Sequence, residues 1–168
     1  MNKQLEEAIE FANKKFEAVG VKNSHFPGVL AILQNEFHVD DLELLTVAIL
    51  HDTLEDTDTT YEELERIFSK NVADLVQEVS HPKNYNEIQK VEFYKKLNSI
   101  SLKAKIIKMA DFADHLRSFI KMRKADPESP YHNQYILFIR EFLNNYPDSK
   151  EKNMVYKLTE ELELYVDA

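Results

Sequence analysis

The chain has 168 residues, of which 43% are hydrophobic and 30% are charged, a composition typical of a globular protein long enough to bury a core. It contains no cysteine, which excludes disulfides, a thiol nucleophile and cysteine-ligated zinc, and its 2 glycines are too few for a phosphate-binding loop or a dinucleotide fingerprint. A net charge of −9, without a dense run of lysine and arginine, argues against duplex nucleic acid as a partner.

Helical periodicity dominates the chain, and no segment alternates like a strand for long. Asp40 and Asp41 can cap one of the predicted helices, and Thr60 with Glu63 forms a capping-box pattern before another. The predicted helices cover residues 3–19, a stretch that begins near 25–27, residues 42 to the His51-Asp52 pair, and residues 61–68, 70–79, 87–97, 101–123, 130–144 and 150–166, with a loop at 80–86. The pattern therefore predicts an all-α fold.

The sequence indicates a single domain without a membrane segment. We find no repeat, linker, targeting signal or apolar stretch near the roughly 20 residues that span a bilayer. We therefore expect one domain over residues 1–168, in the cytoplasm and without a membrane partner. The sequence does not indicate the oligomeric state. If the substrate is anionic, a bound divalent cation would offset the acidic charge of the protein.

A cluster of ligand and acid–base side chains follows the most apolar part of the chain. Residues 44–50 are nearly all apolar, which predicts burial, and residues 51–56 are then His-Asp-Thr-Leu-Glu-Asp. Burying imidazole and carboxylate groups is costly unless they are paired or bind a metal. We therefore expect His51 and Asp52 at the edge of the core, where they are paired or hold an ion.

Two other residues are candidate partners for this pair. Asp111 lies where one face of its helix changes from apolar to polar, and His25 precedes an apolar helix. Taken alone, Asp111 is better explained as a half-exposed or salt-bridged residue, and His25 as a capping or surface histidine. Taken with His51 and Asp52, they would suit a divalent transition ion such as manganese, iron or zinc.

Glu55 and Asp56 follow the His-Asp pair at i+4 spacing, one helical turn further along. At that distance they are placed to act on a water bound to the ion rather than on the ion itself. Of the remaining histidines, we expect surface positions for His38, His81 and His132.

The order His, His-Asp, Asp resembles the HD superfamily of metal-dependent phosphohydrolases. Residues 48–60, Ala-Ile-Leu-His-Asp-Thr-Leu-Glu-Asp-Thr-Asp-Thr-Thr, resemble the alarmone-hydrolase domain of RelA/SpoT-type proteins, especially the small stand-alone hydrolases. Residues 67–79 and 105–111 are similar to two further segments of that family. The resemblance extends from about residue 4 to about residue 145, and it implies a compact HD-domain helical bundle.

The resemblance also implies an activity. Members of the family hydrolyse the 3′-diphosphate of guanosine tetraphosphate or pentaphosphate, releasing pyrophosphate and GDP or GTP, usually with manganese. Glu55 and Asp56 match the acidic pair that positions and deprotonates the attacking water. The metal ligands of the family match His25, His51, Asp52 and Asp111.

The sequence departs from the family where relatives contact the nucleotide. The family's basic segment before the first metal histidine contains an arginine that is absent here, and Lys15 is its nearest basic substitute. His115 occupies the position of an asparagine, and Ser118 that of a threonine. A lysine lacks the planar guanidinium that stacks on a base. We expect these three residues to bind substrate, but two alternatives stay open. One is the same chemistry on another phosphorylated nucleotide, such as an NADPH-type 2′-phosphate or a nucleoside monophosphate, and the other is a non-catalytic nucleotide-binding domain.

Overall fold

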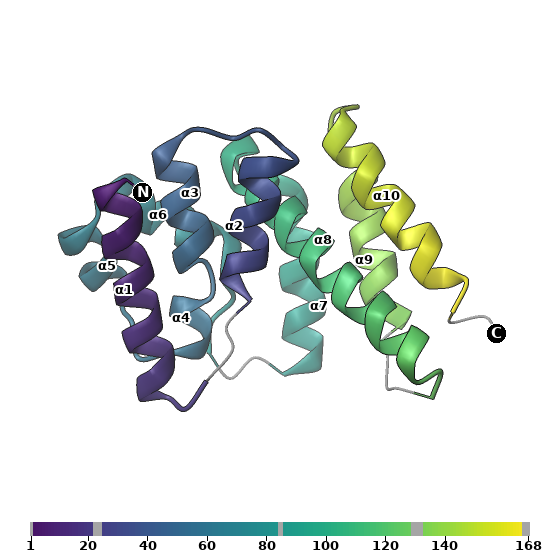
Figure 1. Ribbon diagram of the computed structural model, residues 1–168, viewed down its shortest axis with the longest axis horizontal. Coiled ribbons are helices and arrows are strands. Elements are labelled where there is room, and N and C mark those ends of the chain that lie inside the picture. The colour runs from purple at the N-terminus through teal and green to yellow at the C-terminus, as the bar shows by residue number, and fades with distance from the viewer. Residues whose placement is uncertain (1, 22–24, 84–85, 129–132, 166–168) are drawn as a thin grey trace.

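The computed structural model describes residues 2–21, 25–83, 86–128 and 133–165, and these residues form helices and no strand. The predicted all-α fold is confirmed. The helices, shown in Figure 1, are α1 (Lys3–Ala18), α2 (Phe26–Asn35), α3 (Leu42–Leu50), α4 (Thr53–Asp56), α5 (Tyr61–Ile67), α6 (Lys70–Val79), α7 (Glu87–Lys96), the 3-10 turn η1 (Leu97–Ser99), α8 (Leu102–Ala125), α9 (Asn133–Asn144) and α10 (Lys150–Glu163).

The helix bounds lie close to those expected from periodicity, with one addition. The short helix α4 begins directly after the His-Asp pair, where the sequence pattern indicated only the end of α3. The expected start of α9 at residue 130 and the expected end of α10 at residue 166 lie outside the described residues.

Side chains of the expected types cap the helices. Asp41 accepts hydrogen bonds from the backbone N–H groups of Glu43 and Leu44, which confirms the predicted start of α3. Thr60 likewise accepts from the N–H of Glu63. Glu63 does not complete a capping box as its spacing suggested, because its carboxylate lies 2.8 Å from Nζ of Lys15 on α1. The side chain of Glu63 thus forms a long-range ion pair instead of the local hydrogen bond of a capping box.

Helix α3 forms the centre of the core. All seven residues at 44–50 are buried, because α1, α2, α6 and α8 each pack against this helix. The long helix α8 crosses the molecule diagonally in Figure 1 and also packs against α2, α6 and α10. Its buried positions Ala104, Ala110 and Ala113 are small, so neighbouring helices can approach closely.

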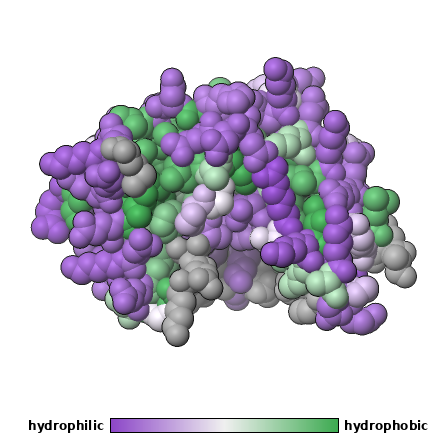
Figure 2. All heavy atoms as spheres, viewed as in Figure 1, coloured by the Kyte–Doolittle hydropathy of each residue, from purple (hydrophilic) through white to green (hydrophobic). Residues whose placement is uncertain are grey.

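The outer face of this bundle is polar. Figure 2 shows hydrophilic side chains over most of the visible surface, with hydrophobic side chains showing between them. In the part of the chain that the structure describes, no helix combines the length and the apolar character needed to cross a membrane.

The central position of α3 generates a stability prediction. Ile49 is fully buried, so Ile49→Ala should lower the free energy of unfolding by about 2–5 kcal/mol through lost contacts and a residual cavity. The same substitution at Ile88, which is 73% exposed on α7, should change it by less than about 0.5 kcal/mol. Urea denaturation of both variants measures the difference, and equal losses would contradict this account of the core.

Candidate metal centre

His51 is placed by the buried run that precedes it. It caps the C-terminus of α3 and is 1% exposed. Its Nδ1 lies 2.8 Å from the backbone oxygen of Ala48, an arrangement in which Nδ1–H donates and Nε2 keeps its lone pair. Hydroxyl groups satisfy the neighbouring backbone oxygens: Thr53 Oγ1 donates to the oxygen of Leu50, and Ser80 Oγ to that of His51. The end of α3 is thus buried without a glycine cap.

The four residues predicted to bind metal lie together. His25 immediately precedes α2, His51 and Asp52 lie between α3 and α4, and Asp111 lies on α8. Nε2 of His25 is 3.0 Å from Nε2 of His51 and 2.9 Å from Oδ2 of Asp52. Nε2 of His51 is 3.1 Å from Oδ1 of Asp52. Oδ1 of Asp111 lies 3.6 Å from Nε2 of His25 and 3.9 Å from Nε2 of His51. Ligand atoms from three separate parts of the fold thus converge on one point.

The atoms at this point suit a cation. Oδ1 of Asp111 is buried and accepts no hydrogen bond from the described residues, although unsatisfied buried acceptors are rare and costly. Beside this oxygen, the Nε2 atoms of His25 and His51 face one another. Imidazole and carboxylate ligands in this number fit a divalent transition ion, which would satisfy the oxygen and both nitrogens together.

The pKa values of the two histidines reflect the negative charge gathered at this point. Burial disfavours the charged form of His25, but the carboxylates of Asp114 and Asp52 outweigh it and raise the pKa of His25 to about 10. Burial opposes the charged form of His51 as well, and Asp52 and Asp111 nevertheless raise the pKa of that imidazole. A cation at this point would replace the protons on the two imidazoles. The affinity for the cation should therefore decrease as the pH is lowered.

Lys108 orients Asp111 from the other side. Its Nζ lies 2.5 Å from Oδ2 of Asp111, which leaves Oδ1 directed at the histidines. Burial alone would raise the pKa of the Asp111 carboxyl, but the charges of Lys108 and His115 hold it well below its ordinary value. The buried ammonium of Lys108 is stabilised in turn by Asp111 and Glu55, which raise its pKa despite burial.

Asp114 and Gly28 orient His25. Oδ2 of Asp114 lies 3.1 Å from Nδ1 of His25, so the opposite ring nitrogen faces the cluster. A Cβ atom at Gly28 would lie 2.1 Å from Oδ1 of Asp114, so only glycine permits this approach. Sequence reasoning assigned Asp114 no role. The available signals were its position three residues after Asp111 and one of the two glycines of the chain three residues after His25.

Of the acidic pair, Glu55 is the more enclosed. Both residues lie on α4, one turn beyond Asp52. Oε1 of Glu55 accepts the backbone N–H of His81 at 2.9 Å, and Oε2 lies 3.0 Å from Nε2 of the same histidine. Burial raises the pKa of Glu55, although Lys108 opposes the shift. Asp56 is exposed on the surface side of α4, and partial burial with the charge of Asp52 raises its pKa as well.

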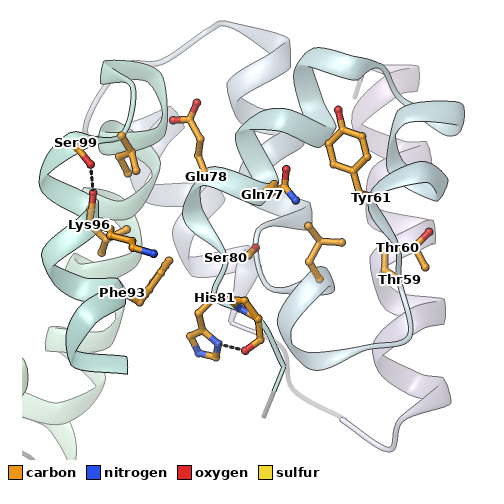
Figure 3. A pocket seen from close by; sticks show the side chains of 14 residues that line it. Thr59, Thr60, Tyr61, Gln77, Glu78, Ser80, His81, Phe93, Lys96 and Ser99 are labelled. Carbon is orange, nitrogen blue, oxygen red and sulfur yellow. Dashed lines mark hydrogen bonds between the residues drawn. The ribbon is translucent and has the colours of Figure 1, made fainter. Parts of the chain in front are cut away.

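His81 is therefore a site residue that sequence reasoning missed. Its predicted surface position is wrong, because it is half-buried against Glu55, whereas His38 is exposed as predicted. His132 lies outside the described residues. His81 also lines a cleft of about 760 Å³ between the α4–α6 region and α7. In Figure 3, Ser80 and His81 lie between Phe93 on one side and Thr59 on the other.

The three predicted substrate-binding residues have different surroundings. His115 lies within the cluster, with Nδ1 3.1 Å from Oδ1 of Asp111. Nζ of Lys15 lies 2.9 Å from Asp58 and 2.8 Å from Glu63, so two carboxylates balance its charge. Ser118 is exposed on α8. A role in substrate binding remains a prediction for all three.

Comparison with known proteins identifies the family of the chain. A family model described as an HD domain matches residues 6–133. The chain is 38% identical over 135 residues to the guanosine-3′,5′-bis(diphosphate) 3′-pyrophosphohydrolase MESH1 of Danio rerio, across 74% of this chain and 72% of that protein. The Homo sapiens protein of that name is 35% identical over 133 residues, which is 74% of this chain and 73% of that one.

Solved structures share the fold. A protein described as a metazoan ortholog of SpoT that hydrolyzes ppGpp matches with a TM-score of 0.80 over 95% of this chain and 96% of that chain, at 22% identity. The lmo0812 protein of Listeria monocytogenes EGD-e matches with a TM-score of 0.67 over 86% and 97%, at 20% identity. A family match over residues 6–133 and relatives aligned along nearly three quarters of the chain lead to the same conclusion: this protein is a member of the HD domain family.

Proposed function

We propose that this protein is a metal-dependent hydrolase that removes the 3′-diphosphate of guanosine tetraphosphate or pentaphosphate, giving pyrophosphate and GDP or GTP. The observation that carries the proposal is the unsatisfied, buried Oδ1 of Asp111 beside two imidazoles. An acidic pair with raised pKa values lies one helical turn beyond Asp52 of the same cluster. The relatives named for this activity, at up to 38% identity, support the choice of substrate.

The residues proposed to hold the ion are His25, His51, Asp52 and Asp111. When bound, a divalent ion supplies Lewis acidity that lowers the pKa of water and offsets charge on the phosphate. Two imidazoles with two carboxylates suit manganese, which we propose as the ion, and also accept iron or zinc.

A carboxylate of the chain accepts the proton of the attacking water. Glu55 and Asp56 position the attacking water, and the carboxylate of Glu55 accepts its proton because burial has made it a stronger base than an exposed glutamate. The water oxygen forms a bond to the phosphorus next to the 3′ oxygen, the bond between that phosphorus and the 3′ oxygen breaks, and the 3′ oxygen takes a proton from solvent. Nε2 of His81, 3.0 Å from Oε2 of Glu55, keeps the carboxylate oriented.

One observation favours a second candidate substrate. Two carboxylates already balance the charge of Lys15, the nearest substitute for the family's arginine. A nucleotide that depends on this ammonium would have to compete with Asp58 and Glu63. The second candidate function is therefore the same hydrolysis on another phosphorylated nucleotide, such as an NADPH-type 2′-phosphate or a nucleoside monophosphate. The acidic pair argues against a purely binding role, which has no need of a general base.

The substrate can be tested directly. The purified protein with Mn²⁺ should convert guanosine tetraphosphate to GDP and pyrophosphate in equal amounts, measured by ion-exchange chromatography, and a chelator should stop the reaction. A parallel assay with NADPH and nucleoside monophosphates distinguishes the candidates. Phosphate release from these alone would replace the alarmone by the second class of substrate, and no turnover of any nucleotide would point to a binding domain.

Ligand and base roles separate in a pair of variants. Asp52→Ala should lose bound metal, because it removes a ligand oxygen next to both histidines. Glu55→Gln keeps an oxygen for the N–H of His81, so it should retain metal while kcat falls by at least about 100-fold. Metal analysis after dialysis and steady-state kinetics measure the two effects. Full metal content in Asp52→Ala, or full turnover in Glu55→Gln, would contradict the corresponding assignment.

The pH profile tests the base. A general base acts in its deprotonated form, so kcat should fall as the pH drops through the pKa of Glu55, which burial raises above 4.5. The charge of His81 lowers this pKa, so His81→Gln should move the fall in kcat to higher pH. The matched control is His38→Asn, which removes an exposed histidine and suits the left-handed backbone there (φ 55°). A profile that does not move in His81→Gln would exclude Glu55 as the base.

A further inference from the structure

His115 lies within the cluster on α8, one turn beyond Asp111. Its ring stacks on the ring of His25, with centroids 4.4 Å apart and planes 25° apart. Its Nδ1 lies 3.1 Å from Oδ1 of Asp111, yet that buried oxygen accepts no hydrogen bond from the described residues. The nitrogen and the oxygen therefore lie side by side at bonding distance without the alignment of a hydrogen bond, as two ligands of one ion do.

We propose that His115 is a fifth protein ligand of the ion, which makes the centre one of three imidazoles and two carboxylates. Ligand atoms of His25, Asp111 and His115 all lie within 4.8 Å of one another, and so do those of His25, His51 and Asp52. His25 belongs to both groups, so the two sets of atoms adjoin each other at this imidazole. The inference rests on the metal centre of the proposed function, and it adds to that centre a residue that the family resemblance predicts to bind substrate.

Tyr135 offers an alternative partner for the same nitrogen. Its hydroxyl lies 3.3 Å from Nδ1 of His115, where it could donate a hydrogen bond to the lone pair that an ion would use. The two uses make opposite predictions for Tyr135→Phe. If His115 only supports Tyr135, this variant should disturb the site as much as loss of His115 does. If His115 binds the ion, removing the competing hydroxyl should leave metal affinity unchanged or higher.

A third imidazole changes which ions the centre prefers. Carboxylate and water ligands suit manganese, whereas imidazole suits zinc and iron. With His115 as a ligand, part of the affinity for Zn²⁺ relative to Mn²⁺ comes from this side chain. Its side chain is 39% exposed, so the ring lies at the open side of a centre whose other walls are formed by the buried His51 and Asp111.

The test measures metal binding without turnover. Affinities for Zn²⁺ and Mn²⁺ are obtained by competition with a chromophoric chelator for the wild-type protein, His115→Asn, Tyr135→Phe and Asp52→Ala. His115→Asn should weaken Zn²⁺ binding by about 10-fold or more and Mn²⁺ binding less, which lowers the selectivity for zinc. Tyr135→Phe should match the wild type or bind more tightly, and Asp52→Ala should lose both ions.

A second measurement needs no variant that could misfold. Pulsed EPR of the Mn²⁺-loaded wild-type protein, labelled with 15N-histidine, should count three coordinated imidazoles, those of His25, His51 and His115. A count of two, or His115→Asn with unchanged affinities for both ions, would overturn the role of His115 and leave the four-ligand centre standing. Failure of the wild-type protein to bind either ion would instead overturn the proposed function itself.

Discussion

Burial of His51 at the end of α3 is the constraint on which the rest of the site depends. A run of core residues ends in an imidazole that is 1% exposed, and the backbone oxygen of Ala48 determines which ring nitrogen faces outward. An imidazole in this position needs a partner, because its desolvation is otherwise uncompensated. The fold supplies carboxylates from α8 and from the start of α4, and these carboxylates in turn need a positive charge.

That requirement explains why the site extends over several layers of residues. Lys108 balances one oxygen of Asp111, and Asp114 fixes the orientation of His25. Each of these contacts leaves one ligand atom directed at the common point. Gly28 belongs to the same arrangement, since a side chain there would displace Asp114 and release His25. In the metal-free protein, burying these polar groups close together costs free energy. Ion binding would offset this cost, so the stability of the protein should depend on metal occupancy.

The sequence was sufficient to predict the helices and the convergence of the four candidate ligands, but not the contacts around them. Helical periodicity reflects which residues face the core, so it located all the helices except the short α4, with small differences in their bounds. The partner of His25 lies 89 residues away on α8, and nothing in local spacing indicates that contact. The pairing of Lys15 with Glu63 and the contact of His81 with Glu55 were missed for the same reason: each joins segments whose relative placement follows from packing.

These contacts separate the chemistry of the site from its specificity. The groups proposed to hold the ion and move the proton lie at the start of α2, between α3 and α4, on α4 and on α8. Helices α2, α3 and α8 pack against one another in the core, so altering the ligands disturbs the fold as well as the reaction. Two of the groups expected to contact the nucleotide lie outside the cluster: Lys15 is paired with acids of its own chain, and Ser118 is exposed. Substitutions at exposed positions such as Ser118 cost little stability. We therefore expect substitutions in this family member where the substrate is recognised. His115 is informative because it departs from the expected family pattern inside the cluster itself. There a different side chain affects the ion as well as the nucleotide.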